Sequence, residues 1–332
     1  MTNTQSLAAS GRGDLRSWPL GDLLVADFPV REPLLNGLLR EGESMMLWAA
    51  TGVGKTMAAL SMALAIAGGG TFLAWKASTP RRVLYVDGEM HLGDLRDRLA
   101  VLMTAVDGVD QEAASRNLVI LARQAQSADA DFPDLATPDG QKAVYDRVRG
   151  GRFDLVILDN FSVLASVDDE NDASAMTPVL SFLLRLKQAG NAAILVHHSG
   201  KGGTDYRGSS KLATTFEVIA GLTAAKGVES RWDSSFDITF GKYRARRGET
   251  IEGTTAWLQE DNAGTLGWKF KLSEDGQLKK LVDAVRSGRF CRQKDVAEAL
   301  GWSPVRIPTK PAMHSNWKPA TCSDLKPAGI PI

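Results

Sequence analysis

Short apolar runs alternate with segments of helical periodicity along the first two thirds of the chain. Uninterrupted apolar runs are typical of parallel strands that are buried on both faces of a sheet. The pattern predicts strands at Met45–Trp48, Arg82–Met90, Leu118–Leu121, Phe153–Asn160 and Ala192–His198, and helices at Met57–Ala67, Leu92–Val106, Gln141–Val148 and Thr177–Gly190. Such an alternation predicts an α/β fold with a mostly parallel sheet flanked by helices.

After Lys211 the helical periodicity stops and strand-like runs follow one another directly. They lie at Phe216–Ala224, Ser235–Tyr243, Thr255–Gln259 and Leu266–Leu272. Strands joined by short polar turns pair antiparallel, so these segments predict an antiparallel extension at the C-terminal edge of the sheet. Before the first strand run, residues 18–43 are apolar but broken by proline and glycine, and we expect them to pack against the core as a lead-in.

The strongest motif joins the first apolar run to the first predicted helix. It reads Ala49-Ala50-Thr51-Gly52-Val53-Gly54-Lys55-Thr56 and continues into Met57. Gly52 and Gly54 permit backbone conformations in which successive N–H groups point at a phosphate. Lys55 would reach the β- and γ-phosphate oxygens, and the Thr56 hydroxyl would bind Mg²⁺. The motif therefore predicts a phosphate loop for ATP and Mg²⁺, with Ala49 as a small residue in place of the usual first glycine.

The alternative interpretation is a glycine turn that happens to precede a lysine. A cation at a helix N-terminus is electrostatically unfavourable without an anion to bind, and the strand before the loop and the helix after it fit a phosphate loop.

Two later strand runs end on acids. Glu89 follows the strand next along the chain, where it could orient or deprotonate an attacking water. Asp159 ends four apolar residues and fits the acid on the Mg²⁺ side of a phosphate-loop site. Strand ends commonly carry solvated acids, so a purely structural role stays open for both.

A third run ends on His197 and His198. Adjacent strand residues face opposite sides, so at most one of these histidines can point at the nucleotide and respond to its γ-phosphate. A structural histidine is the alternative for each of them.

Basic residues gather in two segments. Lys201 and Arg207 lie in the glycine-rich loop after the histidines, and Lys242 and Arg244 open a second cluster with Arg246 and Arg247. An arginine can stabilise the charge of a transferring phosphoryl group, within the chain or from a neighbouring subunit. For the second cluster, a solvated turn between strands is the alternative.

Composition adds few constraints. The chain has 332 residues, 44% hydrophobic and 23% charged, with a formal net charge of zero, as in ordinary soluble proteins. A contact with DNA must therefore use local charges. Cys291 and Cys322 are too few for a disulfide framework or a zinc site, which favours a reducing cytoplasm. Residues 1–16 lack the apolar core of a signal peptide, and no apolar run predicts a membrane span.

Together these motifs resemble the RecA-like hexameric ATPases, and among them the plasmid RepA-type replicative helicases. The likeness covers roughly residues 28–248. It is carried by the phosphate loop, Leu84-Tyr85-Val86-Asp87-Gly88-Glu89, Leu158-Asp159-Asn160, Asp169-Glu170-Asn171, His197-His198 with Gly200-Lys201-Gly202, and Arg207-Gly208-Ser209-Ser210. The last two are the most specific.

The resemblance implies a role for each matching residue. Glu89 would be the catalytic acid, Asp159 the Mg²⁺ acid, and His198, with His197 beside it, the γ-phosphate sensor. Arg207 would be an arginine finger that reaches the next subunit's site, and Lys242-Tyr243-Arg244 looks like the second-ranked element for that role. Asp168-Asp169-Glu170 departs from the pattern, because acids facing a central channel repel phosphates and leave single-stranded DNA to the Lys201 loop.

We therefore expect an ATPase domain over residues 18–273 that forms a homo-oligomeric ring, a hexamer by the resemblance, and moves along or unwinds single-stranded DNA. A non-unwinding recombination or repair ATPase and a nucleotide-binding regulator are the alternatives. Residues 1–17 predict a disordered leader. Helices predicted at 278–286 and 293–300 place a partial helix-turn-helix in residues 274–302, and the proline-rich segment 303–332 predicts a disordered tail.

Overall fold

The structure is a computed structural model. It describes residues 15, 17–167, 176–199, 214–225, 227–228, 230, 234–244, 251–273, 281–282, 284–285 and 292–299. The chain divides into two compact units, Met1–Glu32 and Pro33–Ile332. Each unit is described separately below.

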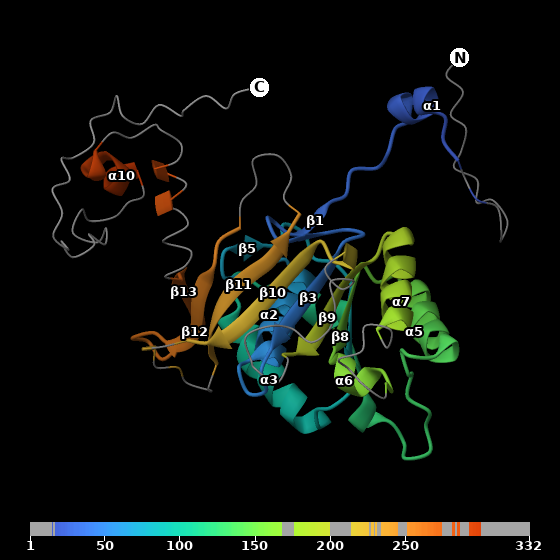
Figure 1. Cartoon of the computed structure of the whole chain (residues 1–332). Coiled ribbons are helices and arrows are strands. Elements are labelled where there is room, and N and C mark those ends of the chain that lie inside the picture. Colours follow the sequence, from blue (N-terminus) through green and yellow to red (C-terminus); the bar gives the residue numbers. More distant parts are fainter. Residues whose placement is uncertain are drawn as a thin grey trace. The chain divides into compact units, whose positions relative to one another are not determined.

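A nine-stranded sheet forms the centre of the larger unit, in the order β13-β12-β11-β10-β3-β9-β8-β6-β7 (Figure 1). Its strands are β3 (Ser44–Ala49), β6 (Val83–Asp87), β7 (Leu118–Ala122), β8 (Leu155–Asp159), β9 (Ala192–His198), β10 (Val218–Ala224), β11 (Ser235–Tyr243), β12 (Thr254–Glu260) and β13 (Leu266–Leu272). The strands from β10 through β3 to β7 pair in parallel, and β10 to β13 pair antiparallel. This arrangement confirms the predicted fold class.

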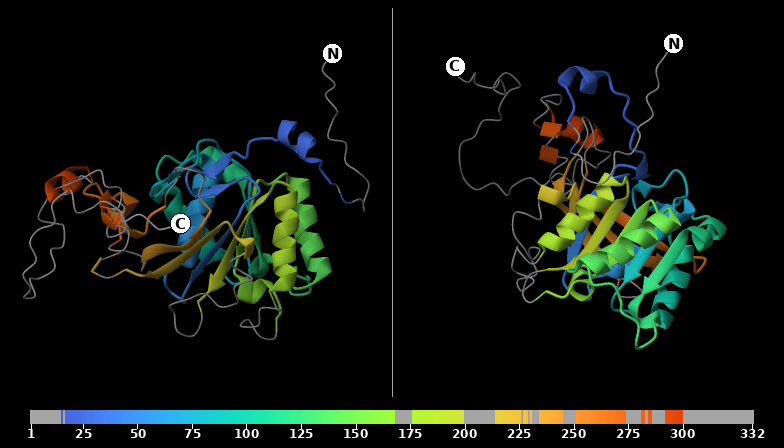
Figure 2. Two further views of the ribbon diagram at one scale, coloured as in Figure 1. Left: turned by 45° about the horizontal axis from the view of Figure 1, so that its top comes forward. Right: turned by 90° about the vertical axis from the view of Figure 1, so that its right-hand side faces the viewer.

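Helices cover both faces of the parallel strands, as the turned views show (Figure 2). Side chains of α2 (Lys55–Gly68), α3 (Leu92–Ala105) and α4 (Gln111–Asn117) share one hydrophobic cluster with one face of the sheet. Those of α5 (Pro138–Gly151), α6 (Phe161–Leu164) and α7 (Thr177–Gln188) share the other cluster. Successive residues of β3 contribute to opposite clusters, Met45 to the first and Met46 to the second, which explains its unbroken apolar sequence.

The antiparallel strands contact α2, the helix that follows the phosphate loop. Trp268 of β13 donates from Nε1 to Ser61 Oγ of α2 at 2.9 Å. The same indole packs against Phe236 of β11 and Phe72, with ring centroids 5.4 and 5.5 Å away. The extension of the sheet edge is therefore tied to the helix that carries Lys55.

Several local features were not predicted or differ from the prediction, among them the short helix α6 and the end of β6 at Asp87. Residues 71–76 form the hairpin β4 (Thr71–Phe72) and β5 (Trp75–Lys76), α4 was not predicted, and α5 begins three residues before the predicted start. β7 is only half-buried, because it is the edge strand of the sheet. An apolar run alone does not distinguish an edge strand from a central one.

The predicted lead-in separates into two parts. Leu34, Leu35 and Leu39, from β1 (Pro33–Leu35) and β2 (Leu39–Arg40), are buried in the core of the larger unit. In the smaller unit α1 (Leu20–Val25) has no buried residue. Trp18 packs on Phe28 in the same unit, with ring centroids 5.6 Å apart.

Towards the C-terminus the structure describes α10 (Gln293–Ala299), which matches a predicted helix, and residues 281–282 and 284–285 are also helical. The predicted leader, apart from residues 15 and 17, and the whole predicted tail lie outside the described residues. Across the described residues, none of the helices combines the length and apolar character that a bilayer span requires.

Candidate active site

The phosphate loop has the backbone geometry that its glycines predict. It leaves β3 at Ala49 and enters α2 at Lys55. Gly52 and Gly54 have φ values of +81° and +107°, in the region that side chains with a Cβ rarely adopt. A Cβ at Gly54 would also lie 3.1 Å from Cδ1 of Phe236, whose ring packs beneath the loop. Only glycine fits this position without a shift of the loop or of β11.

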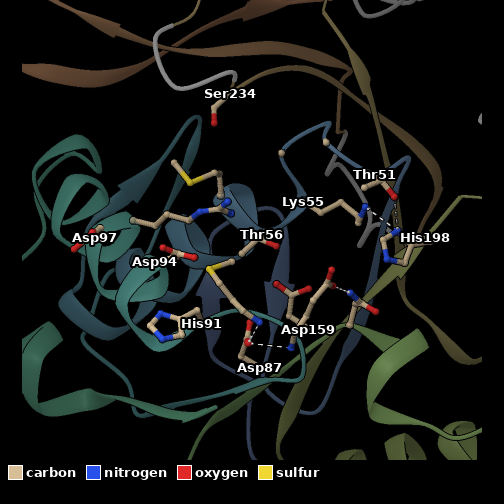
Figure 3. A pocket seen from close by; sticks show the side chains of 17 residues that line it. Thr51, Lys55, Thr56, Asp87, His91, Asp94, Asp97, Asp159, His198 and Ser234 are labelled. Atoms are coloured by element: carbon tan, nitrogen blue, oxygen red, sulfur yellow. Dashed lines mark hydrogen bonds between the residues drawn. The ribbon is translucent and has the colours of Figure 1, made fainter. Parts of the chain in front are cut away.

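Lys55 uses its three ammonium protons within the site. Its Nζ lies 3.0 Å from the carbonyl oxygens of Ala49 and Ala50 and 3.2 Å from Nδ1 of His198 (Figure 3). Burial lowers the pKa of Lys55, and the nearby carboxylates of Asp159 and Glu89 oppose that effect. A phosphate that binds Lys55 must therefore replace at least one of these three acceptors.

Two buried carboxyl groups lie side by side at the ends of β6 and β8. Asp87 and Asp159 are register partners and are 2% and 4% exposed. Asp159 accepts a hydrogen bond of 2.5 Å from the Tyr85 hydroxyl and another from the Thr56 side chain. Burial raises the pKa of Asp159, while these hydrogen bonds and Lys55 lower it. The predicted pair of Mg²⁺ ligands, Thr56 and Asp159, is in contact.

Glu89 accepts and donates hydrogen bonds with residues at the ends of both β6 and β8. Asp87 Oδ1 accepts from the backbone N–H groups of Glu89 and Met90 at 3.1 and 2.7 Å. Asn160, directly after β8, donates from Nδ2 to Glu89 Oε2 at 2.7 Å. The carboxylate is otherwise exposed to the cavity.

A cavity of about 740 Å³ joins these groups. Lys55, Thr56, Asp87, Glu89, Asp159, Asn160 and His198 all line it, together with Met90, His91, Asp94, Asp97 and Arg98 from the start of α3. Figure 3 shows Lys55, Thr56 and Asp159 directed towards its centre. A volume of this size is that of a small-molecule site.

The two histidines differ in position, as the alternation of strand residues requires. His198 is half-buried at the cavity, beside Lys55 and 3.5 Å from the Thr51 hydroxyl. His197 is fully buried on the other side of the sheet, where its ring packs edge-on against Phe161 at 5.1 Å. Only His198 can contact a ligand in this cavity.

Lys242 and Arg244, the described basic residues of the second cluster, lie away from the cavity, and Arg246 and Arg247 lie outside the described residues. Arg244 donates from its backbone N–H to the carbonyl of Glu217, whose carboxylate binds the N–H of Ser44 at the start of β3. The phosphate loop leaves the other end of β3, roughly 17 Å away at the rise of a strand. Lys242, two strands from β3, has a pKa lowered by burial and by Arg244. Neither side chain lines the cavity of its own chain. Lys201, Arg207 and the acidic segment 168–170 lie outside the described residues.

Comparison with known protein families shows to which family this chain belongs. Residues 10–204, more than half of the chain, match a family described as an AAA domain. The chain belongs to this family, a family of P-loop ATPases. Its matched segment contains the phosphate loop, Glu89, Asp159 and His198.

Two solved structures resemble this AAA domain at low sequence identity. A KaiC-like protein, PH0186 from Pyrococcus horikoshii OT3, is 16% identical, with a TM-score of 0.48 over 71% of this chain and 93% of that one. The flagellar accessory protein FlaH from Methanocaldococcus jannaschii is 12% identical, with a TM-score of 0.48 over 70% of this chain and 91% of that one.

The groups at the cavity fit a nucleoside triphosphate with Mg²⁺. The loop amides, the start of α2 and Lys55 suit phosphate oxygens. Thr56 and Asp159 would offer two side-chain oxygens, which suits Mg²⁺ because this ion usually takes its other ligands from phosphates and water. Tyr85, Asp87 and Asn160 lie in the motifs that carry the resemblance, but no role in the site was predicted for them. Their positions beside the predicted acids were a signal, but the hydrogen bonds of Asn160 and Tyr85 join strands about seventy residues apart.

Proposed function

We propose that the chain is a Mg²⁺-dependent ATPase that works as a homo-oligomeric ring on single-stranded DNA in plasmid, phage or mobile-element replication. The observation that carries the ATPase part is the convergence of Lys55, Thr56, Glu89 and Asp159 on one cavity. Lys55 and Thr56 begin α2, Glu89 follows β6 and Asp159 ends β8, and the chemistry of the four groups suits phosphoryl transfer to water.

Each residue has a defined task in this reaction. The loop amides and Lys55 bind the phosphate oxygens and neutralise charge that develops on them. Glu89 orients the attacking water and accepts its proton. Mg²⁺, held through Thr56 and Asp159, would supply further neutralisation of the terminal phosphates. His198, in contact with Lys55, would detect the γ-phosphate, and buried His197 would act only by supporting the strand end.

The ring is inferred from the family likeness and from basic residues that lie away from the cavity of their own chain. Lys242 and Arg244 lie away from their own cavity, so they could assist hydrolysis only in a neighbour. By the family likeness Arg207 ranks first as the trans-acting finger. An arginine from a partner subunit can raise hydrolysis by roughly 10³-fold to 10⁵-fold. The likeness also implies a hexamer, with DNA contacted through the Lys201 loop.

DNA unwinding rests on the family likeness alone, so its test is direct. We expect single-stranded DNA to stimulate ATP turnover and the protein to displace a strand from a forked duplex. Stimulated turnover without displacement would favour a recombination or repair ATPase that does not unwind. Nucleotide binding without turnover would favour a regulator, against which the placement of Glu89 argues.

A further inference from the structure

Asn160 combines a buried position with a contact to the proposed base. The residue is 4% exposed, and its Nδ2 donates to Glu89 Oε2 at 2.7 Å. Within the described part of the chain, its Oδ1 is buried and has no hydrogen-bond partner. The side-chain amide thus makes one hydrogen bond, and that bond is to Glu89.

The backbone of Asn160 has a separate structural task. Its carbonyl oxygen accepts from the N–H groups of Val163 and Leu164 at 3.2 and 3.1 Å, at the start of α6. The side chain makes no capping hydrogen bond to this helix. A substitution that keeps the backbone therefore leaves the helix start intact and removes only the contact with Glu89.

The direction of this hydrogen bond matters for catalysis. The amide N–H₂ group can only donate and the Glu89 side-chain oxygen accepts from it, so the contact fixes the position of Oε2. Its other oxygen, Oε1, is left to meet a water in the cavity. Asp87 fixes the backbone of the same residue through the N–H of Glu89. Asp87 of β6 therefore fixes the main chain of Glu89, and Asn160, directly after β8, fixes its side chain.

We propose that Asn160 is a positioning residue for ATP hydrolysis, which holds the Glu89 carboxylate in place and aims it at the attacking water. The inference rests on the proposed ATPase function. Asn160 touches no reacting atom; it acts through Glu89. Removal of its donor should lower the rate of hydrolysis and leave nucleotide binding unchanged, since the groups assigned to the phosphates are the loop amides and Lys55.

The test compares Asn160→Asp with Asn160→Ala. Aspartate has the same shape but presents an acceptor to the acceptor Oε2, so it separates a donor role from a packing role. We expect both variants to bind a fluorescent ATP analogue within about threefold of wild type. Their kcat should fall by about 10-fold to 100-fold, and Asn160→Asp should be at least as slow as Asn160→Ala.

Asn191→Asp is the matched control. Asn191 also donates from Nδ2, to the carbonyl of Phe153 at 2.6 Å, and its Oδ1 is likewise buried without a partner in the described structure. It precedes β9 at the opposite end from His198 and does not line the cavity. We expect it to lower thermal stability while kcat stays within about twofold of wild type.

Three results would overturn the proposal. These are wild-type kcat in Asn160→Asp, a loss of activity explained by weaker nucleotide binding, and an equal loss of kcat in Asn191→Asp. If Asn160→Asp does not fold, Asn160→Ser decides, because its hydroxyl is too short to reach Glu89. A wild-type protein that binds ATP without turnover would instead refute the ATPase function itself.

Discussion

At the scale of single residues, Lys55 connects the phosphate loop to the end of β9. Two of its three acceptors are carbonyl oxygens of the loop itself, and the third is Nδ1 of His198. Because a phosphate must displace one acceptor, the histidine is the partner that can leave without distorting the loop. His198 would then respond to nucleotide through Lys55, in addition to any direct contact with the γ-phosphate.

This exchange predicts the effect of His198→Ala. The variant removes a competitor for Lys55, so ADP should bind equally well or up to about tenfold more tightly, the value of one hydrogen bond. Stimulation of turnover by DNA should fall, because the response to the γ-phosphate is lost. Isothermal titration and steady-state turnover measure the two effects. Markedly weaker ADP binding would show that His198 is a direct ligand and not a competitor.

Asp87 gives a prediction about pH. Burial raises its pKa from the ordinary value of 3.8 to about 6, although hydrogen bonds from Met90 and Glu89 act in the opposite direction. The folded protein therefore holds this proton more tightly than the unfolded chain. The resulting stability is fully present below about pH 4 and is lost as the pH rises through 6.

Asp87→Asn keeps an acceptor for the two N–H groups and removes the buried charge. We expect its free energy of unfolding at pH 7 to exceed that of wild type by about 1 to 3 kcal/mol, with little difference at pH 4. Urea unfolding at the two pH values measures this. A destabilisation of equal size at both values would mean that burial does not set the charge of Asp87.

At the scale of elements, the phosphate loop is packed against β11 through Gly54 and Phe236. Gly54 combines a φ of +107° with a Cβ distance of 3.1 Å to the Phe236 ring. The Phe236 ring in turn contacts Trp268, which binds α2 through Ser61. The antiparallel strands therefore extend the sheet and also pack against the phosphate loop.

Gly54→Ala should consequently lose nucleotide binding by at least about tenfold and lose about 1 to 3 kcal/mol of stability. Gly37→Ala is the matched control, because its φ is +75° but nothing lies within 4 Å of the position that a Cβ would take there. Gly37→Ala should introduce a similar backbone strain but leave the affinity for nucleotide unchanged. Equal nucleotide binding in wild type and Gly54→Ala would contradict the packing of the loop on Phe236.

Most of the sheet and the phosphate loop could be predicted because their signals are local. Apolar runs marked the strands, and the sequence from Ala49 to Thr56 marked the loop. Helix α4 was missed because only two small apolar residues, Ala113 and Ala114, mark its buried face. The hydrogen bonds of Asn160 and Tyr85 could not be predicted, since they depend on which strands lie side by side. Strand order is a property of the whole sheet.

At the scale of the whole molecule, the proposed assembly predicts complementation between variants. Arg207→Ala and Glu89→Ala should each bind ATP and lose at least about 100-fold in kcat. Mixed rings contain interfaces with an intact Glu89 and an intact arginine, so mixing the two variants should restore part of the turnover. Absence of rescue would assign Arg207 a role within its own subunit, and Lys242 and Arg244 would then be tested in the same way.

The central claim is that Lys55 and Glu89 serve one site that hydrolyses ATP with Mg²⁺. Phosphate release by wild type, Lys55→Ala and Glu89→Gln, with nucleotide binding measured in parallel, tests it most directly. We expect turnover in wild type only, binding without turnover in Glu89→Gln, and loss of both in Lys55→Ala. Near-normal turnover in either variant would contradict the account.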